Sequence, residues 1–144
     1  MTTLQQLGER GQSVWLDFIS RELVTTGQLQ RRVSDENVTG LTSNPTIFQK
    51  AIAEGSLYDD QIRELIDSGI DDPNDVFIEL AITDIQDAAD ILRPVHERTS
   101  GADGYVSLEV PPSLSHDTDA TIATARTLWE LVDRPNLKIG RAHV

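Results

Sequence analysis

Acidic and amide side chains stand at the ends of three short β-prone runs, and they are the residues best suited to chemistry. Asp17 follows the run 14–16, Thr42, Ser43 and Asn44 close a second run, and Glu109 lies near the end of a third. In parallel α/β folds the carboxyl ends of the strands meet at one edge, where active sites gather. Two carboxylates and an amide on neighbouring strands there would make a small acid–base site.

Structural roles compete with this interpretation at two of the positions. Asn44 precedes Pro45, and Asn followed by Pro is typical of a helix start, which favours a capping role. Asp17 could also cap the helix that follows it. Glu109 has no such explanation, because a glutamate within an apolar strand must face solvent or a polar site.

The elements that position these residues alternate along the chain. The pattern predicts β-strands over 13–18, 37–44 and 105–110, a fourth strand starting at Asn136-Leu137, and helices over 19–29, 45–55, 57–69, 73–95 and 117–132. This order is typical of an α/β fold with a parallel sheet. No glycine-rich phosphate-binding motif follows any strand, so a nucleotide-binding doubly wound sheet has no support. A (β/α)8 barrel needs about 250 residues, so a barrel of this length must be incomplete.

The longest helical pattern, 73–95, starts at Asp72-Pro73 and either ends near Pro94 or kinks there and continues to Glu97. Its apolar stripe is Phe77, Leu80, Ala81, Ile85, Ala88 and Leu92, with Asp84, Asp87 and Asp90 assigned to the other side. Gly27 is predicted to stop the first helix, and Ser56 with Asp59 to cap the third. Trp15 and Trp129 are predicted to be core residues.

Composition narrows the classes of protein. The 144-residue chain carries 24 acidic and 12 basic residues, a formal charge of −12, which disfavours binding to nucleic acid and to anionic membranes. It contains no cysteine, and the start of the sequence shows no secretory signal, so we expect a cytoplasmic protein. The three histidines never stand at a metal-binding spacing, and we expect no metal site.

Four segments give the chain a resemblance to a known family. SVWLDFISREL, GLTSNPTIFQKAI, GYVSLEVPPSLSHD and LWELVDRPNL resemble the N-terminal portion of transaldolase, in its longer bacterial branch. The resemblance runs from about residue 4 to residue 137, and the TSNP element followed by the E-V strand is specific to the family only in combination. It implies that the chain is the N-terminal part of an incomplete (β/α)8 TIM barrel, with three to four βα units and extra helices.

The resemblance also implies an activity and roles for four residues. Transaldolases of the pentose phosphate pathway move a dihydroxyacetone unit from a ketose phosphate, sedoheptulose 7-phosphate or fructose 6-phosphate, to an aldose phosphate through a lysine Schiff base, without cofactor or metal. By match to the family motifs, Asp17 is the proton-transferring acid/base and Glu109 positions and activates water. Asn44 hydrogen-bonds the dihydroxyacetone unit, and Thr42 lines the same floor. The related fructose-6-phosphate aldolases carry glutamine where this chain has Glu109.

The resemblance stops at the tail. The family reads NLMIKIPAT, whereas Lys138 here follows Leu137 at once, two positions before the family's lysine, or about 6.6 Å along a strand. The remaining IGRAHV is the translation of ATCGGAAGAGCACACGTC, a common sequencing-adapter read. We therefore expect residues 1–137 to be natural, and 138–144 to be a non-native tail.

Without the Schiff-base lysine, the chain is expected to be inactive. An open half-barrel with unpaired strand edges is also expected to aggregate or fold poorly. Two alternatives stay open on the sequence: a member resembling fructose-6-phosphate aldolase, and a non-enzymatic acidic interaction module built on helices 45–98. The sequence does not predict an oligomeric state.

Overall fold

The computed structural model describes residues 2–43 and 45–140 of the chain. Its centre is one sheet of four parallel strands arranged in chain order: β1 (Trp15–Leu16), β2 (Gly40–Thr42), β3 (Val106–Glu109) and β4 (Leu137–Gly140). The predicted α/β fold with a parallel sheet is confirmed, as are the places of its strands. Successive neighbours in one direction are the arrangement of a barrel wall, here four strands wide.

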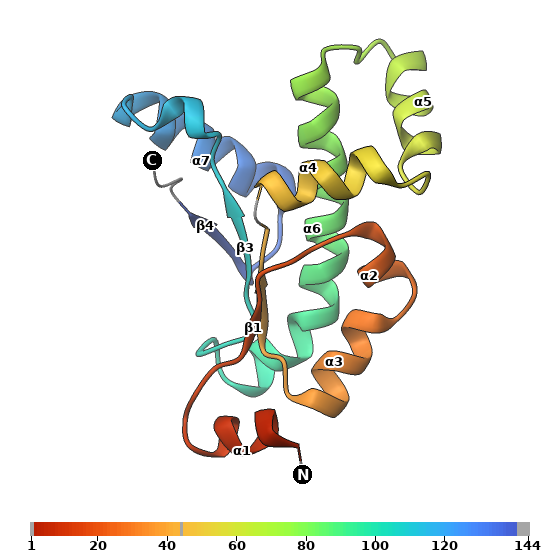
Figure 1. Ribbon diagram of the computed structural model, residues 1–144. Coiled ribbons are helices and arrows are strands. Elements are labelled where there is room, and N and C mark those ends of the chain that lie inside the picture. The colour runs from red at the N-terminus through yellow and green to blue at the C-terminus, as the bar shows by residue number, and fades with distance from the viewer. Residues whose placement is uncertain (1, 44, 141–144) are drawn as a thin grey trace.

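One helix precedes β1, and the other helices lie in the connections between the strands (Figure 1). They are α1 (Thr3–Glu9), α2 (Arg21–Thr25), α3 (Gln28–Glu36), α4 (Pro45–Glu54), α5 (Asp59–Asp67), α6 (Pro73–Arg98) and α7 (Thr118–Val132), with a 3-10 turn at Pro112–Leu114. Figure 1 shows α1 below the amino ends of the strands, α4 across their upper ends and α6 running alongside the sheet. The long crossover between β2 and β3 therefore holds three helices, where the sequence had predicted extra ones.

Several helix ends follow the predicted local chemistry. Asp72 caps α6 by accepting hydrogen bonds from two backbone N–H groups, with Pro73 as the first helical residue. Asp117 caps α7 by accepting from the Ala120 N–H. Gly27, in a left-handed conformation at φ 75°, separates α2 from α3.

Other expectations about the helices were wrong. The predicted helix 19–29 is two helices, and α3 continues to Glu36. Of the two alternatives at Pro94, the end there is wrong and the continuation is confirmed: α6 runs to Arg98, because proline removes one N–H while burial of the helix face supports the remainder. Ser56 caps nothing; α5 starts after Tyr58 without a side-chain cap. Helix α1 was missed, although Thr2 and Gln5 form a capping box there.

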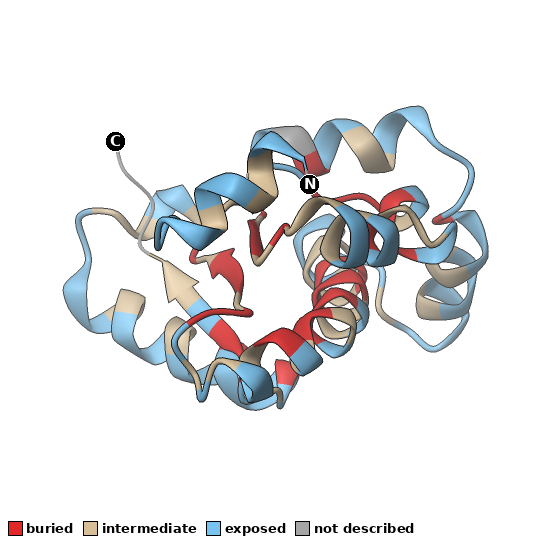
Figure 2. Ribbon diagram, turned by 90° about the horizontal axis from the view of Figure 1, so that it is seen from below, coloured by how far each residue is buried: buried red, intermediate tan, exposed pale blue. Residues whose placement is uncertain are grey.

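The core lies between the sheet and the helices. It joins strand residues such as Leu41, Val106 and Leu137 to Ile85 and Leu92 of α6, all at most 3% exposed. Figure 2 shows buried residues on the strands and on α6, and mostly exposed residues on the peripheral helices. Trp129 was expected in this core, but it is 47% exposed on α7. Within the described residues, no helix combines the length and apolarity needed to cross a membrane.

Candidate active site

The two faces of the sheet carry different side chains, and the polar residues share one face. Strand register pairs Leu41 with Val106 and Val106 with Leu137, all in the core, while Thr42 pairs with Ser107 and Ser107 with Lys138. Because side chains alternate along a strand, the second set points away from the helices. We call this second surface, which also carries Trp15, Asp17, Gly40, Glu109 and Gly140, the open face.

Asp17 and Thr42 are brought together on the open face. The Thr42 hydroxyl donates a hydrogen bond to Asp17 Oδ1, although the two residues are 25 apart in sequence. Asp17 is exposed, and it does not cap the helix that follows: Ser20 caps α2, accepting from the Leu23 N–H at 3.2 Å. The capping alternative for Asp17 is therefore wrong, and its carboxylate is available at the strand end.

Glu109 ends β3 on the same face and is half-buried. It lies opposite Gly140 of β4, where a Cβ atom would stand 3.3 Å from Glu109 Cγ. A side chain at position 140 would therefore be a direct neighbour of the Glu109 carboxylate.

An apolar cavity of about 330 Å³ borders Glu109 between α4, α6 and α7. Its lining includes Phe48, Phe77 and Leu128, and Glu109 is its one charged residue among the described ones.

Asn44 lies outside the described residues. Its neighbour Ser43 is buried and donates a hydrogen bond from its hydroxyl to the Ser107 carbonyl oxygen, 2.9 Å away. This bond holds the end of β2 against β3, so the strand ends that carry Thr42 and Glu109 are fastened to each other.

Lys138 lies on the open face opposite Ser107, nearer the amino-terminal ends of the strands than Glu109. Its Nζ lies 5.6 Å from the centre of the Trp15 ring, within range of a cation–π interaction. Trp15 in turn donates from Nε1 to Asp103 Oδ1 at 3.0 Å and crosses Gly40, where a Cβ atom would overlap the indole. The lysine amine is therefore directed to the amino-terminal part of the sheet, two residues before the position opposite Glu109.

The described residues form no group of three or more His, Cys, Asp or Glu side chains that could hold a metal ion. Beside the strand ends, sequence reasoning missed a buried ion pair between Arg21 and Asp84. Asp84 was assigned to the polar side of α6, but it is 1% exposed. Its spacing of four from both Leu80 and Ala88 places it on the apolar stripe, which is the signal that could have found it.

The described strands form a four-stranded parallel wall of an α/β fold, with the carboxylates of Asp17 and Glu109 on one face. Residues 14–139 match the family model described as Transaldolase/Fructose-6-phosphate aldolase, and the chain belongs to this family. It is 54% identical over 136 residues to a transaldolase of Thermobifida fusca and 50% identical to one of Parafrankia sp., covering 94% of this chain in each case. A transaldolase of Saccharopolyspora erythraea is 49% identical over 142 residues. The chain spans about 37% of the length of the first two relatives.

Proposed function

We propose that this chain is part of a transaldolase that transfers a dihydroxyacetone unit from a ketose phosphate to an aldose phosphate in the cytoplasmic pentose phosphate pathway. The observation that carries the proposal is the Asp17–Thr42 hydrogen bond on the open face, with Glu109 on the same face. Family membership and the names of the relatives support it. The substrates are sugar phosphates such as fructose 6-phosphate, and neither nucleic acid nor a membrane takes part.

The chemistry requires proton transfer close to a Schiff base. When a lysine amine adds to the ketose carbonyl, a C–N bond forms and the carbonyl oxygen leaves as water. The bond between the α and β carbons of the Schiff base then breaks, and its electron pair stays on the dihydroxyacetone unit as an enamine. The β-hydroxyl becomes the departing aldehyde, which requires a base for its proton, and Asp17 takes that proton. Glu109 orients the water that is released and later consumed. Thr42 holds the Asp17 carboxylate, and Asn44 binds the dihydroxyacetone unit.

The amine belongs at position 140, the neighbour of Glu109, where this chain has glycine. Lys138 is engaged with Trp15, so we propose that it does not replace the missing nucleophile. We attribute residues 138–144 to a non-native tail, which sequencing the genomic locus beyond Leu137 tests: a natural reading frame encoding KIGRAHV would refute this attribution.

Trapping with borohydride tests the assignment of the site. The chain and its Gly140→Lys variant are incubated with fructose 6-phosphate and reduced, and adducts are located by mass spectrometry. We expect an adduct on the variant at residue 140 and none on Lys138 of the unchanged chain. An adduct on Lys138 would contradict the proposed inactivity. A folded Gly140→Lys variant without an adduct would contradict the placement of the nucleophile.

A fructose-6-phosphate aldolase is the second candidate, because the matching family includes both activities. Glu109 favours transaldolase. When Glu109→Gln is added to the Gly140→Lys variant, we expect adduct formation to slow by about tenfold or more, since a carboxylate that activates water is lost. An unchanged rate would favour the aldolase.

A further inference from the structure

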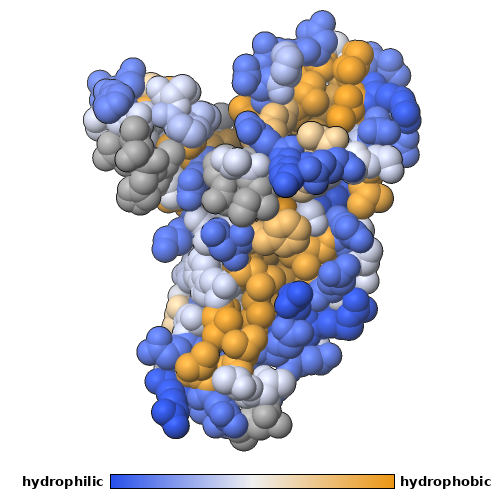
Figure 3. All heavy atoms as spheres, in the orientation of Figure 1, coloured by the Kyte–Doolittle hydropathy of each residue, from blue (hydrophilic) through white to orange (hydrophobic). Residues whose placement is uncertain are grey.

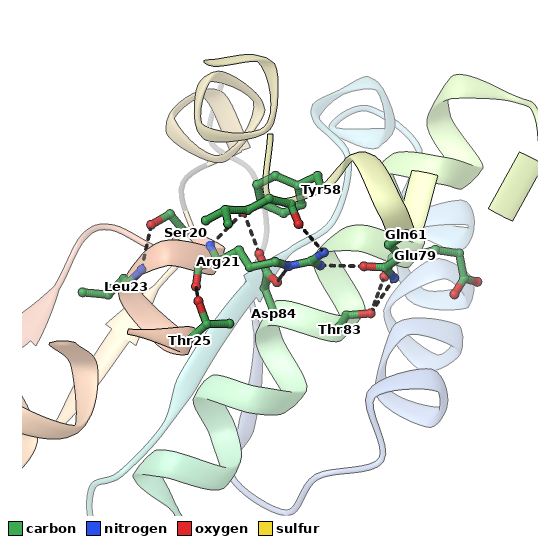
Figure 4. Close-up of polar contacts among 10 residues, drawn as sticks. Ser20, Arg21, Leu23, Thr25, Tyr58, Gln61, Glu79, Thr83 and Asp84 are labelled. Atoms are coloured by element: carbon green, nitrogen blue, oxygen red, sulfur yellow. Dashed lines mark hydrogen bonds and ion pairs between the residues drawn. The ribbon is translucent and has the colours of Figure 1, made fainter. Parts of the chain in front are cut away.

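A buried polar cluster joins the start of α2 to the start of α5 and to α6 (Figure 4). Arg21 Nε donates to Asp84 Oδ1 at 2.8 Å, and Arg21 Nη2 donates to Gln61 Oε1 at 2.6 Å. The Tyr58 hydroxyl donates to Asp84 Oδ2 at 2.8 Å. The Arg21 guanidinium also lies 4.3 Å from the centre of the Tyr58 ring. Each carboxylate oxygen of Asp84 thus has a donor, and Gln61 continues the cluster by donating from Nε2 to the Thr83 hydroxyl at 2.8 Å.

Stability alone is a poor explanation for this cluster. Asp84 is 1% exposed, Tyr58 is 2% exposed, and the Arg21 side chain is 12% exposed. Taking such an ion pair out of water costs about as much as its attraction returns, and apolar replacements are often as stable. The pKa of Asp84 is raised overall, because burial raises it by more than the hydrogen bonds from Arg21 and Tyr58 lower it. What the cluster supplies, and an apolar one would not, is a fixed direction for its hydrogen bonds.

One of those bonds reaches the backbone. The Tyr58 hydroxyl accepts the N–H of Arg21 at 2.8 Å, and Arg21 is the first residue of α2. The first N–H groups of a helix have no partner within the helix, and here a tyrosine from a distant segment supplies one. Tyr58 is itself fixed by its bond to Asp84 and by edge contact with the Phe48 ring at 6.3 Å.

The segment 17–20 lies between two such fixed points. At its start, the Asp17 carboxylate accepts a hydrogen bond from Thr42. At its end, Ser20 caps α2, and the following N–H is held by Tyr58. Between them Ile19 is 1% exposed, whereas Phe18 is 39% exposed. Only three residues, one of them the buried Ile19, therefore join Asp17 to the first residue of α2.

We propose that Tyr58 is a positioning residue for Asp17: its hydroxyl fastens the first turn of α2 to Asp84 of α6, and so fixes the segment that presents the Asp17 carboxylate. The functional value of this position rests on the proposed role of Asp17. The extra crossover helices between β2 and β3 thereby support a strand end that they do not follow in sequence.

Tyr58→Phe tests the proposal because it removes one oxygen atom and keeps the ring. Amide hydrogen exchange and the Asp17 carboxyl carbon chemical shift are measured by NMR in the unchanged 144-residue chain and in the variant. We expect exchange at Arg21 to accelerate by about tenfold or more, and the Asp17 carboxyl signal to shift. Asp84→Asn keeps the Tyr58 hydroxyl but replaces the carboxylate that accepts its hydrogen bond with a neutral amide. We expect the same local changes with a smaller magnitude.

Asn136→Ala is the matched control. Asn136 is fully buried and bonds the carbonyl oxygens of Ala89 and Gly104, so its loss destabilises the chain without touching α2. If Tyr58→Phe alters residues 17–21 no more than this control does, the proposal is overturned. It is also overturned if residues 17–25 of the unchanged chain exchange like an unfolded peptide. None of these readouts depends on turnover, so they can fail while the proposed activity stands, and the reverse.

Discussion

The helix-covered face and the open face of the same four strands are built on different principles. On the covered face, Leu41 and Val106 are fully buried against α6, and their contribution comes from apolar area removed from water. On the open face, Asp17, Thr42 and Glu109 keep partial or full exposure and are arranged by directional hydrogen bonds and register. Apolar burial on the covered face therefore holds the wall together, while the open face keeps polar side chains accessible.

The largest expected effect lies on the covered face. Leu92→Ala removes a fully buried side chain of α6 and leaves a cavity, so the free energy of unfolding should fall by about 2–5 kcal/mol. Denaturant titration followed by circular dichroism measures it. Leu131→Ala on α7, where the side chain is 46% exposed, is the control and should cost under about 0.5 kcal/mol. Equal losses would remove the distinction between core and surface.

A smaller effect is expected where the open face is crowded. Gly40→Ala would place a Cβ atom into the Trp15 indole, which must then move and release its hydrogen bond to Asp103. We expect a loss of about 1–3 kcal/mol, with a change in tryptophan fluorescence. At Gly140→Ala the nearest atom to the new Cβ would be Cγ of the flexible Glu109 side chain at 3.3 Å, with Ser107 Oγ at 3.6 Å, so this substitution should cost little. A Gly40→Ala chain with unchanged fluorescence would argue against the indole's position.

The buried Asp84 should make stability depend on pH. Burial raises its pKa in the folded chain, so the folded state holds this proton more tightly than the unfolded state. Its contribution to the free energy of unfolding therefore falls as pH rises from the usual carboxyl range to the raised pKa, by at most about 1.4 kcal/mol per pH unit. Asp84→Asn removes the dependence. Identical pH profiles for variant and unchanged chain, measured by denaturant titration, would contradict it.

The smallest effect on stability is expected at the candidate site. Thr42→Val keeps the shape of the side chain but removes the hydroxyl that donates to the exposed Asp17 carboxylate. The free energy of unfolding should change by no more than about 0.5 kcal/mol, while the Asp17 carboxyl signal in NMR should move. A loss as large as that of Leu92→Ala would mean that the open face also carries the fold.

The two faces also explain what the sequence could predict. Local conformational preferences predicted the strands and several helix ends. The signals were the β-prone runs, Gly27, Asp72-Pro73 and Asp117. Asp17, Thr42 and Glu109 could be chosen because strand ends of a parallel sheet meet at one edge.

Features that depend on contacts between residues far apart in sequence could not be predicted from local sequence patterns. The partners Arg21 and Asp84 are 63 residues apart, so no local pattern pairs them. The continuation of α6 past Pro94 depends on burial of residues such as Val95, which outweighs the local cost of proline. The exposure of Trp129 depends on which neighbours cover α7, and residue type alone does not determine that.

The sheet also has an outer edge, which is formed by β1. Figure 3 shows hydrophobic residues in a band over the part of the molecule where β1 runs in Figure 1. Among the described residues, β1 pairs with β2 alone. An unpaired strand edge with apolar surroundings can pair with another chain.

Helix α6 has a consequence for the order in which the chain can fold as it leaves the ribosome. It contacts α2, α3, α5, α7 and β3, and its 26 residues begin only at Pro73. Until they emerge, β1 and β2 can bury their apolar side chains only against the few core residues of α2, α3 and α4, such as Leu23, Leu29 and Phe48. We therefore expect the first 72 residues to become fully structured only after this one helix has been synthesised.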